Sequence, residues 1–189
     1  MTLIGRALFT FSLLMLTQSA LAKGTFGIVE GRLGATLEDF DEAGPDPSFG
    51  FSAGLTVKQP GFPFRLYIVG SFDSTYRSTF RSDRSDLDFA GEARLVLPLS
   101  NVFRIYGLLG GGARYTEQTL YPDGAWVQSR GWTPLGLTGG GIQIRPHRNF
   151  SFGARAVYTW TDPSNDLGHE LFGESTDRWT GSGFFGIHF

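Results

Sequence analysis

Large apolar residues occupy every second position at the end of the chain. Trp179, Phe185, Ile187 and Phe189 share one parity, and the positions between them are small or polar apart from Phe184. An alternation with a period of two residues is typical of a β-strand that has one apolar face. Such a strand suits a wall between lipid and a polar interior. This feature gives the first hypothesis about the chain.

The same alternation recurs along most of the sequence. It predicts eight strands, near residues 25–37, 48–58, 64–76, 86–97, 103–116, 131–145, 150–160 and 178–189. The sixth is the weakest of these predictions, because Leu135 and Leu137 fall on the wrong parity for Ile142 and Ile144. We expect a β-bulge at Gly139–Gly141 that resets the phase.

The connections between the predicted strands alternate in length. The connections at 59–63, 98–102 and 146–149 are short and turn-like, whereas those at 38–47, 77–85, 117–130 and 161–176 are longer and polar. This rhythm is typical of outer-membrane barrels, in which the long loops are extracellular. The sequence therefore predicts an all-β protein, an eight-stranded antiparallel transmembrane β-barrel. It has four long extracellular loops, three short periplasmic turns and both termini on the periplasmic side.

The start of the chain predicts a secretory signal. Arg6 is the only charge in residues 1–22, and an apolar run covers Ala7–Leu16. The small-x-small pattern of a signal-peptidase site follows at Ala20-Leu21-Ala22. The apolar run is too short to span a bilayer as a helix. We therefore expect cleavage near Ala22, which leaves residues 23–189 as one outer-membrane β-barrel domain.

Composition agrees with a barrel and excludes some partners. The chain has no cysteine, so disulfides cannot hold it together, and a closed hydrogen-bonded barrel is one device that replaces them. Glycine accounts for 27 of the 189 residues, which long helices would not tolerate. A formal net charge of −2 is too mild to indicate nucleic acid as a partner.

The leader, the eight amphipathic strands, the alternating connections and the terminal GFFGIHF together resemble a known family. They are similar to the small outer-membrane β-barrel proteins of the OmpA-barrel and OmpX type, over residues 23–189. The resemblance implies that the last strand carries a recognition signal for the barrel-assembly machinery, and Phe185, Ile187 and Phe189 match that signal. It implies a place in the outer membrane of a Gram-negative bacterium.

Alternation alone leaves open which face looks inward. A soluble, lipocalin-like barrel would place the apolar face inside. We expect the apolar face outside, with Leu55, Leu95 and Ala154 toward lipid, because aromatic residues gather at both ends of this face. The predicted aromatic girdle consists of Phe49, Phe72, Tyr115, Trp160 and Trp179 near the long connections, with Phe64, Phe103, Phe150 and Phe189 near the short ones.

The opposite face carries charges in the middle of the strands. We expect Glu30, Arg32, Glu92, Arg94 and Arg155 to lie at similar heights in the lumen. Unpaired charges there would be costly, so these residues are predicted to form an ion-pair network. Eight strands leave a lumen that side chains just fill. A gated or leaky ion path is the alternative interpretation of the same charges.

No residue pattern indicates catalysis, a metal or a cofactor. His147 and His188 are expected to be structural, and His169 lies with Glu170 in a long connection, which is a poor platform for a catalytic triad. The His-x-Ser pattern of barrels that are lipid A deacylases does not occur. The acidic segment 38–46 lacks the spacing of a calcium loop.

The sequence thus favours an integral outer-membrane barrel with a structural or surface-interaction role. We expect a monomer that contacts outer-membrane lipid and lipopolysaccharide. A narrow channel for small solutes and a membrane lipid-modifying enzyme are the two alternatives.

Overall fold

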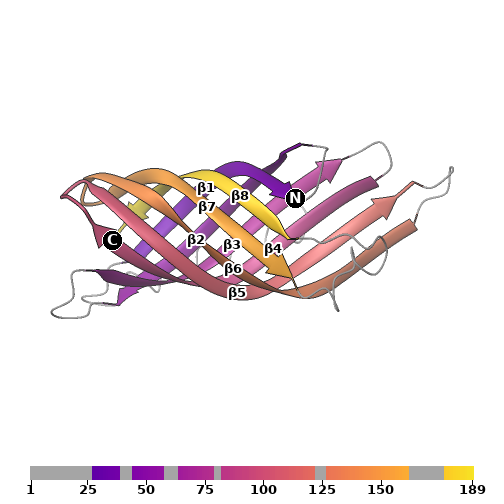
Figure 1. Ribbon diagram of the computed structural model, residues 1–189, viewed down its shortest axis with the longest axis horizontal. Helices are drawn as coiled ribbons and strands as arrows, with labels where there is room; N and C mark the ends of the chain where they lie inside the picture. Colours follow the sequence, from indigo (N-terminus) through magenta and orange to yellow (C-terminus); the bar gives the residue numbers. More distant parts are fainter. Residues whose placement is uncertain (1–26, 39–43, 58–63, 79–81, 122–126, 162–176) are drawn as a thin grey trace.

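The computed structural model describes residues 27–38, 44–57, 64–78, 82–121, 127–161 and 177–189. They form β1 (Gly27–Glu38), β2 (Asp46–Val57), β3 (Arg65–Ser78), β4 (Ser82–Pro98), β5 (Phe103–Leu120), β6 (Val127–His147), β7 (Phe150–Thr161) and β8 (Arg178–His188). Each strand pairs antiparallel with the next and β8 pairs with β1, so the sheet closes into a barrel (Figure 1). No helix among the described residues has the length and apolar character needed to cross a membrane. The predicted signal peptide, residues 1–22, lies outside the described residues.

Alternating parity separates an apolar outer face from a largely polar lumen. Leu55 and Leu95 are 44% and 47% exposed on the outside, whereas Glu92 and Arg155 are 2% and 5% exposed in the lumen. This arrangement confirms the predicted faces and excludes a soluble barrel with an apolar interior. An outer surface so rich in large apolar side chains requires a lipid environment.

The predicted bulge at Gly139–Gly141 is wrong. Over the described strand, β6 pairs with β7 in continuous register from Leu135 to Ile144, and the register shifts only between Ile144 and His147 at the strand end. Leu135 and Leu137 therefore keep one parity with Gln143, and all three side chains are buried in the lumen. The prediction failed because it assumed that every large apolar side chain faces lipid.

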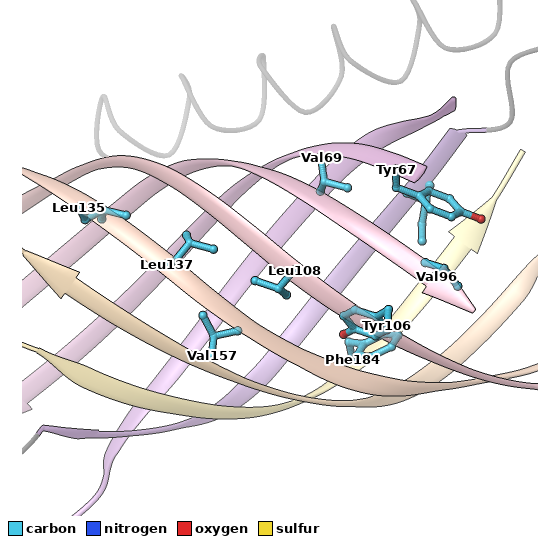
Figure 2. Packing of buried hydrophobic residues seen from close by; sticks show 10 residues of the cluster. Tyr67, Val69, Val96, Tyr106, Leu108, Leu135, Leu137, Val157 and Phe184 are labelled. Carbon is cyan, nitrogen blue, oxygen red and sulfur yellow. The ribbon is translucent and has the colours of Figure 1, made fainter. Parts of the chain in front are cut away.

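An apolar cluster fills part of the lumen. Its members are Ile28, Tyr67, Val69, Val96, Tyr106, Leu108, Leu135, Leu137, Val157 and Phe184. Figure 2 shows the cluster extending along the barrel from Leu135 at one end to Tyr67 and Val96 at the other. The rings of Tyr106 and Phe184 lie 6.3 Å apart, centroid to centroid.

Two glycines make room for these lumenal rings. A Cβ on Gly141 would lie 2.8 Å from the Tyr106 ring, and one on Gly153 would lie 2.7 Å from the Phe184 ring. The same Cβ atoms would lie even closer to the carbonyl oxygens of Ala154 and Ile142, respectively, so a larger residue would displace the neighbouring backbone as well as an aromatic ring. The last glycine of the predicted bulge is therefore a packing residue of a regular strand.

The barrel has two unlike rims. At the turn rim, residues 58–64, 99–102 and 148–149 connect β2–β3, β4–β5 and β6–β7. At the loop rim, β3 and β4 stay paired to Ser78 and Asp83, so only residues 79–82 separate the paired ends. Likewise β5 and β6 stay paired to Leu120 and Val127.

The segments 77–85 and 117–130, which we expected to be loops, are thus mostly strand. Strands β3 to β6 form a sheet that extends past the other strands (Figure 1). We expected loops there because these segments are rich in polar residues.

We predict that Leu109→Arg lowers the free energy of unfolding by about 2–4 kcal/mol, because it puts a charge near the middle of the lipid-facing surface. Leu109 is 62% exposed on β5, midway between the aromatic residues Phe103 and Tyr115. Leu99→Arg, in the β4–β5 turn, is the matched control and should cost less than about 1 kcal/mol. Denaturant titration in phospholipid vesicles measures both variants, and equal costs would contradict the assignment of this face to lipid.

Candidate functional site: the charged barrel interior

A connected group of ion pairs lies in the lumen between β1, β2, β4 and β7. Glu30 accepts hydrogen bonds from Arg94 Nη1 at 2.5 Å and from Ser52 Oγ at 3.0 Å. Arg94 also donates from Nε to Glu92 Oε2 at 2.8 Å. Arg155 Nη1 donates to Glu92 as well, at 3.3 Å from Oε1 and 3.4 Å from Oε2. Arg94 therefore bridges the two glutamates, and Glu92 also contacts Arg155.

Asp73 extends this group to the last predicted member. Its Oδ2 lies 2.9 Å from Arg32 Nη2 and 3.5 Å from Arg155 Nη2. Arg32 Nη2 also donates to the carbonyl oxygens of Phe51 and Phe72, each at 3.1 Å. All five residues that the sequence placed in the network thus lie in one group, which we call the central network. The sequence put Asp73 on the inward face but did not assign it to the network.

A second group of ion pairs lies closer to the loop rim, and the sequence analysis missed it. Arg178 donates from Nη1 to Asp86 at 2.8 Å and from Nη2 to Asp88 at 2.7 Å. Arg114 Nε donates to Asp88 at 2.8 Å, and the hydroxyl of Thr116 donates to Asp86 at 2.7 Å. Arg114 and Arg178 are each only 1% exposed. We call these residues, with Arg84, the upper network.

Charge balance explains why so many ionised groups can be buried together. Five carboxylates and six guanidinium groups take part in the two networks, namely Glu30, Asp73, Asp86, Asp88 and Glu92 with Arg32, Arg84, Arg94, Arg114, Arg155 and Arg178. A buried charge without a partner is strongly destabilising, whereas a paired and hydrogen-bonded one is tolerated. Each carboxylate contacts at least one arginine, so the two networks together are close to electrically neutral.

Little free space remains beside the central network. A cavity of about 10 Å³, enough for about one water molecule, lies near Glu30 and Arg94. Ile28, Tyr67, Val96, Tyr106 and Gln143 complete its lining. The side chains of the networks and of the apolar cluster together occupy the lumen here.

The histidines of the described chain make structural contacts. His188 Nε2 and Ser151 Oγ lie 2.8 Å apart, and Gln143 Nε2 donates to the same hydroxyl at 3.0 Å. These three hydrogen-bonded side chains face the lumen, and Ser151 is fully buried. His147 is exposed at the end of β6, where its Nδ1 accepts a hydrogen bond from the backbone N–H of Asn149. His169 lies outside the described residues.

Potential metal ligands do not cluster in the part of the chain that the structure describes. It contains no group of three or more His, Cys, Asp or Glu side chains placed to hold a metal ion. Most of the acidic segment 38–46 lies outside the described residues.

Aromatic side chains form rows on the outer face. Six predicted girdle residues are exposed, namely Phe49, Phe103, Phe150, Trp160, Trp179 and Phe189, and Phe64, Phe72 and Tyr115 are partly exposed. Phe72 contacts Phe89, which contacts Trp132, and Trp132 contacts Tyr115, with ring centroids 5.2 to 5.9 Å apart. The row therefore includes two residues, Phe89 and Trp132, that the sequence analysis did not select.

The terminal strand presents its apolar parity outward. Phe185, Ile187 and Phe189 are 53%, 38% and 50% exposed, next to the outward residues of β7. The rings of Phe150 and Phe185 stack at 6.0 Å. The predicted assembly signal thus lies on the outer surface at the turn rim.

Comparison with known proteins identifies the family that shares this architecture. The sequence matches the family described as the outer membrane protein beta-barrel domain over residues 8–177. No curated protein matches the chain in sequence. Neisserial surface protein A (NspA) has a similar solved structure, with 12% identity over 87% of this chain and 97% of that chain and a TM-score of 0.57.

Two further solved structures share the fold. Ail, the attachment invasion locus protein of Yersinia pestis, is 19% identical over 89% of this chain and 100% of its own, with a TM-score of 0.55. The outer membrane enzyme PagL is 13% identical over 85% of this chain and 98% of its own, with a TM-score of 0.51. These likenesses concern the fold alone.

We predict that Glu92→Gln lowers the free energy of unfolding by about 3–5 kcal/mol, because it leaves the buried charges of Arg94 and Arg155 short of a carboxylate. Glu117→Gln is the control, since Glu117 accepts a hydrogen bond from Gln128 near the loop rim. That change should cost only about 0.5 kcal/mol. Unfolding in urea, followed by tryptophan fluorescence in lipid vesicles, measures the difference. An unchanged stability of the Glu92 variant would show that the barrel does not need this charge.

Proposed function

Because the chain belongs to the family of outer membrane protein beta-barrel domains, we propose that it is a structural and surface-interaction barrel of a Gram-negative outer membrane. Its interior is closed by its own side chains, and it meets other molecules through its outer face and its loop rim. It carries out no catalysis in this proposal.

The observation that carries the proposal is the pairing of arginines with carboxylates across the lumen. A wide aqueous channel would leave such charges solvated on its wall. Here Glu92 and Arg94 are 2% and 4% exposed and contact each other at 2.8 Å. Eight-stranded barrels are narrow enough for side chains to fill them. The networks therefore support a closed barrel.

Two surfaces are available for interaction. The apolar outer face with its aromatic rows fits outer-membrane lipid, and we propose a monomer surrounded by lipid and lipopolysaccharide. The extended part of β3–β6 presents polar side chains on a hydrogen-bonded sheet. There Asp83 accepts hydrogen bonds from Ser78 and Tyr121, at 2.6 and 2.8 Å. These bonds hold the pKa of the Asp83 carboxyl below its usual value, so Asp83 carries a negative charge at this rim.

A narrow channel is the second candidate, and one observation favours it. Arg155 holds Glu92 and Asp73 through contacts of 3.3 and 3.5 Å, longer than the 2.8 Å contact between Arg94 and Glu92. Its Nε has no hydrogen-bond partner among the described residues. A side chain held this weakly could move aside and open a path.

An enzyme is not part of the proposal. The buried pair of Ser151 and His188 faces the lumen, where the cavity lined by the neighbouring Gln143 has room for only about one water molecule. PagL is an enzyme with a similar barrel, but the low identity carries over only its fold.

We predict that the wild-type protein shows little or no stable conductance in planar lipid bilayers, because side chains fill the lumen. Arg155→Ala should conduct as little as the wild type. Arg178→Ala, which removes an arginine from the upper network, is the matched control. A large wild-type conductance would overturn the closed barrel. Conductance that appears in the Arg155 variant alone would favour the gated channel.

The assembly signal generates a separate prediction. Combined Phe185→Ala and Phe189→Ala substitutions should lower the outer-membrane level in cells several-fold, because the assembly machinery would lose its recognition residues. Phe152→Ala removes an equally exposed ring from β7, directly opposite Phe185, and should leave the level unchanged. Refolding all variants from denaturant into vesicles separates recognition from stability, since each exposed ring contributes only about 1–3 kcal/mol by burial. Equal outer-membrane levels of the double variant and the wild type would mean that Phe185 and Phe189 serve only as girdle residues.

A further inference from the structure

Three arginines gather on the lumenal side of the turn rim. Arg104 on β5 pairs with the buried Gln143 on β6, which fixes its inward parity. Arg145 is two residues beyond Gln143, and Arg65 is two residues before the buried Tyr67 on β3. A hydrogen bond between Tyr67 and Arg104 ties β3 to β5, and the three guanidinium charges repel one another. We call this group the turn-rim arginines.

This rim contains no carboxylate side chain to balance the arginines. Residues 57–67, 96–106, 143–151 and 184–189, which make the turns and the adjoining strand ends, include Lys58, Arg65, Arg104, Arg145 and Arg148 but no aspartate or glutamate. None of the ion pairs among the described residues involves the turn-rim arginines. Glu30, which lines the same cavity as Tyr67, is engaged by Arg94. These arginines therefore differ from those of the central and upper networks.

Part of this charge is buried without a hydrogen-bond acceptor. Arg104 is only 9% exposed, yet its Nε and Nη1 have no partner among the described residues. Arg145 Nε is buried and unpartnered in the same sense, while its Nη2 donates to the Arg148 carbonyl oxygen. An unsatisfied buried donor costs free energy, and so does the repulsion of like charges. An anion seated between the arginines would relieve both costs.

We propose that the turn-rim arginines form a binding site for a phosphate group. The planar guanidinium fork matches the oxygens of phosphate and carboxylate alike. A single carboxylate, however, offers two oxygens and one charge to three cations. A phosphate group offers more oxygens and, as a monoester or free ion, close to two charges. Phosphate is thus the better match to the unpartnered N–H donors of Arg104 and Arg145 together with the charge of the exposed Arg65.

The test uses the full-length folded protein in an uncharged detergent. Isothermal titration with inorganic phosphate should show saturable binding, whereas acetate and chloride at equal ionic strength should not compete. Arg104→Gln combined with Arg145→Gln should weaken phosphate binding by at least about tenfold, because hydrogen bonds to charged groups are lost. Arg130→Gln makes the same kind of change at an exposed site near the loop rim and should leave the affinity unchanged. Circular dichroism and heat-modified gel mobility establish that each variant is folded.

A conservative variant keeps the proposal testable if the double variant does not fold. Arg104→Lys retains the charge but loses the fork, so it should bind phosphate more weakly than the wild type while keeping the barrel intact. Unchanged affinity in both Arg104 variants would overturn the site. Absence of wild-type binding, acetate that competes equally well, or equal losses in the Arg130 control would also overturn it.

Nanodiscs of defined lipid composition distinguish two sources of the phosphate group. If the ligand is a soluble phosphate compound, the affinity for inorganic phosphate should be equal in phosphatidylcholine and in mixed phosphatidylcholine–phosphatidic acid discs. If the ligand is a lipid headgroup, phosphatidic acid, which carries a phosphate monoester, should compete with inorganic phosphate and should raise the thermal midpoint of the wild type. The Arg104/Arg145 variant should then show no such shift. Either result supports the phosphate site and identifies its source.

Discussion

The barrel depends on the neutralisation of buried charge inside it. Closing eight strands forces one parity of every strand into a narrow lumen, and in this chain that parity carries Glu30, Glu92, Asp86 and Asp88. Each of these carboxylates contacts at least one arginine that reaches across from another strand or along its own. Without that pairing the closed sheet would bury bare charges, and the desolvation cost would exceed what backbone pairing gains.

The remaining lumen is shaped around these pairs. The apolar cluster, which includes Leu108, Leu135, Leu137 and Val157, fills the parts of the lumen that the networks leave free. Figure 2 shows it as a line of side chains along the barrel. Tyr106 links the two regions, because its ring lies 5.8 Å below the Arg94 guanidinium carbon and also contacts Phe184. Polar and apolar filling together leave a solid interior, which supports the proposed structural role.

Sequence alternation predicted the fold well because it reports a local property. Which side a residue faces follows from parity alone, and this gave the outward position of the girdle. Parity together with the expected height along each strand gave five members of the central network. Neither fixes which residues meet across a tilted, closed sheet. Partners such as Asp86 and Arg178 meet only because of the strand tilt and the register of a closed sheet, so the upper network was missed. The bulge predicted between Leu137 and Ile142 is wrong for a different reason, because Leu135 and Leu137 belong to an apolar part of the lumen wall and face inward. The arginines of the turn rim became informative only when burial showed which of their N–H groups lack acceptors.

A double-mutant cycle on Glu30 and Arg94 tests the central claim most directly, because Glu30 has no other ion pair among the described residues. The free energies of unfolding of the wild type, Glu30→Gln, Arg94→Gln and the double variant would be measured in the same lipid vesicles. If buried pairing sustains the barrel, the two changes are non-additive, with a coupling of about 1–3 kcal/mol. Additivity within about 0.5 kcal/mol would contradict the account, because it would mean that the two charges stabilise the barrel independently of each other.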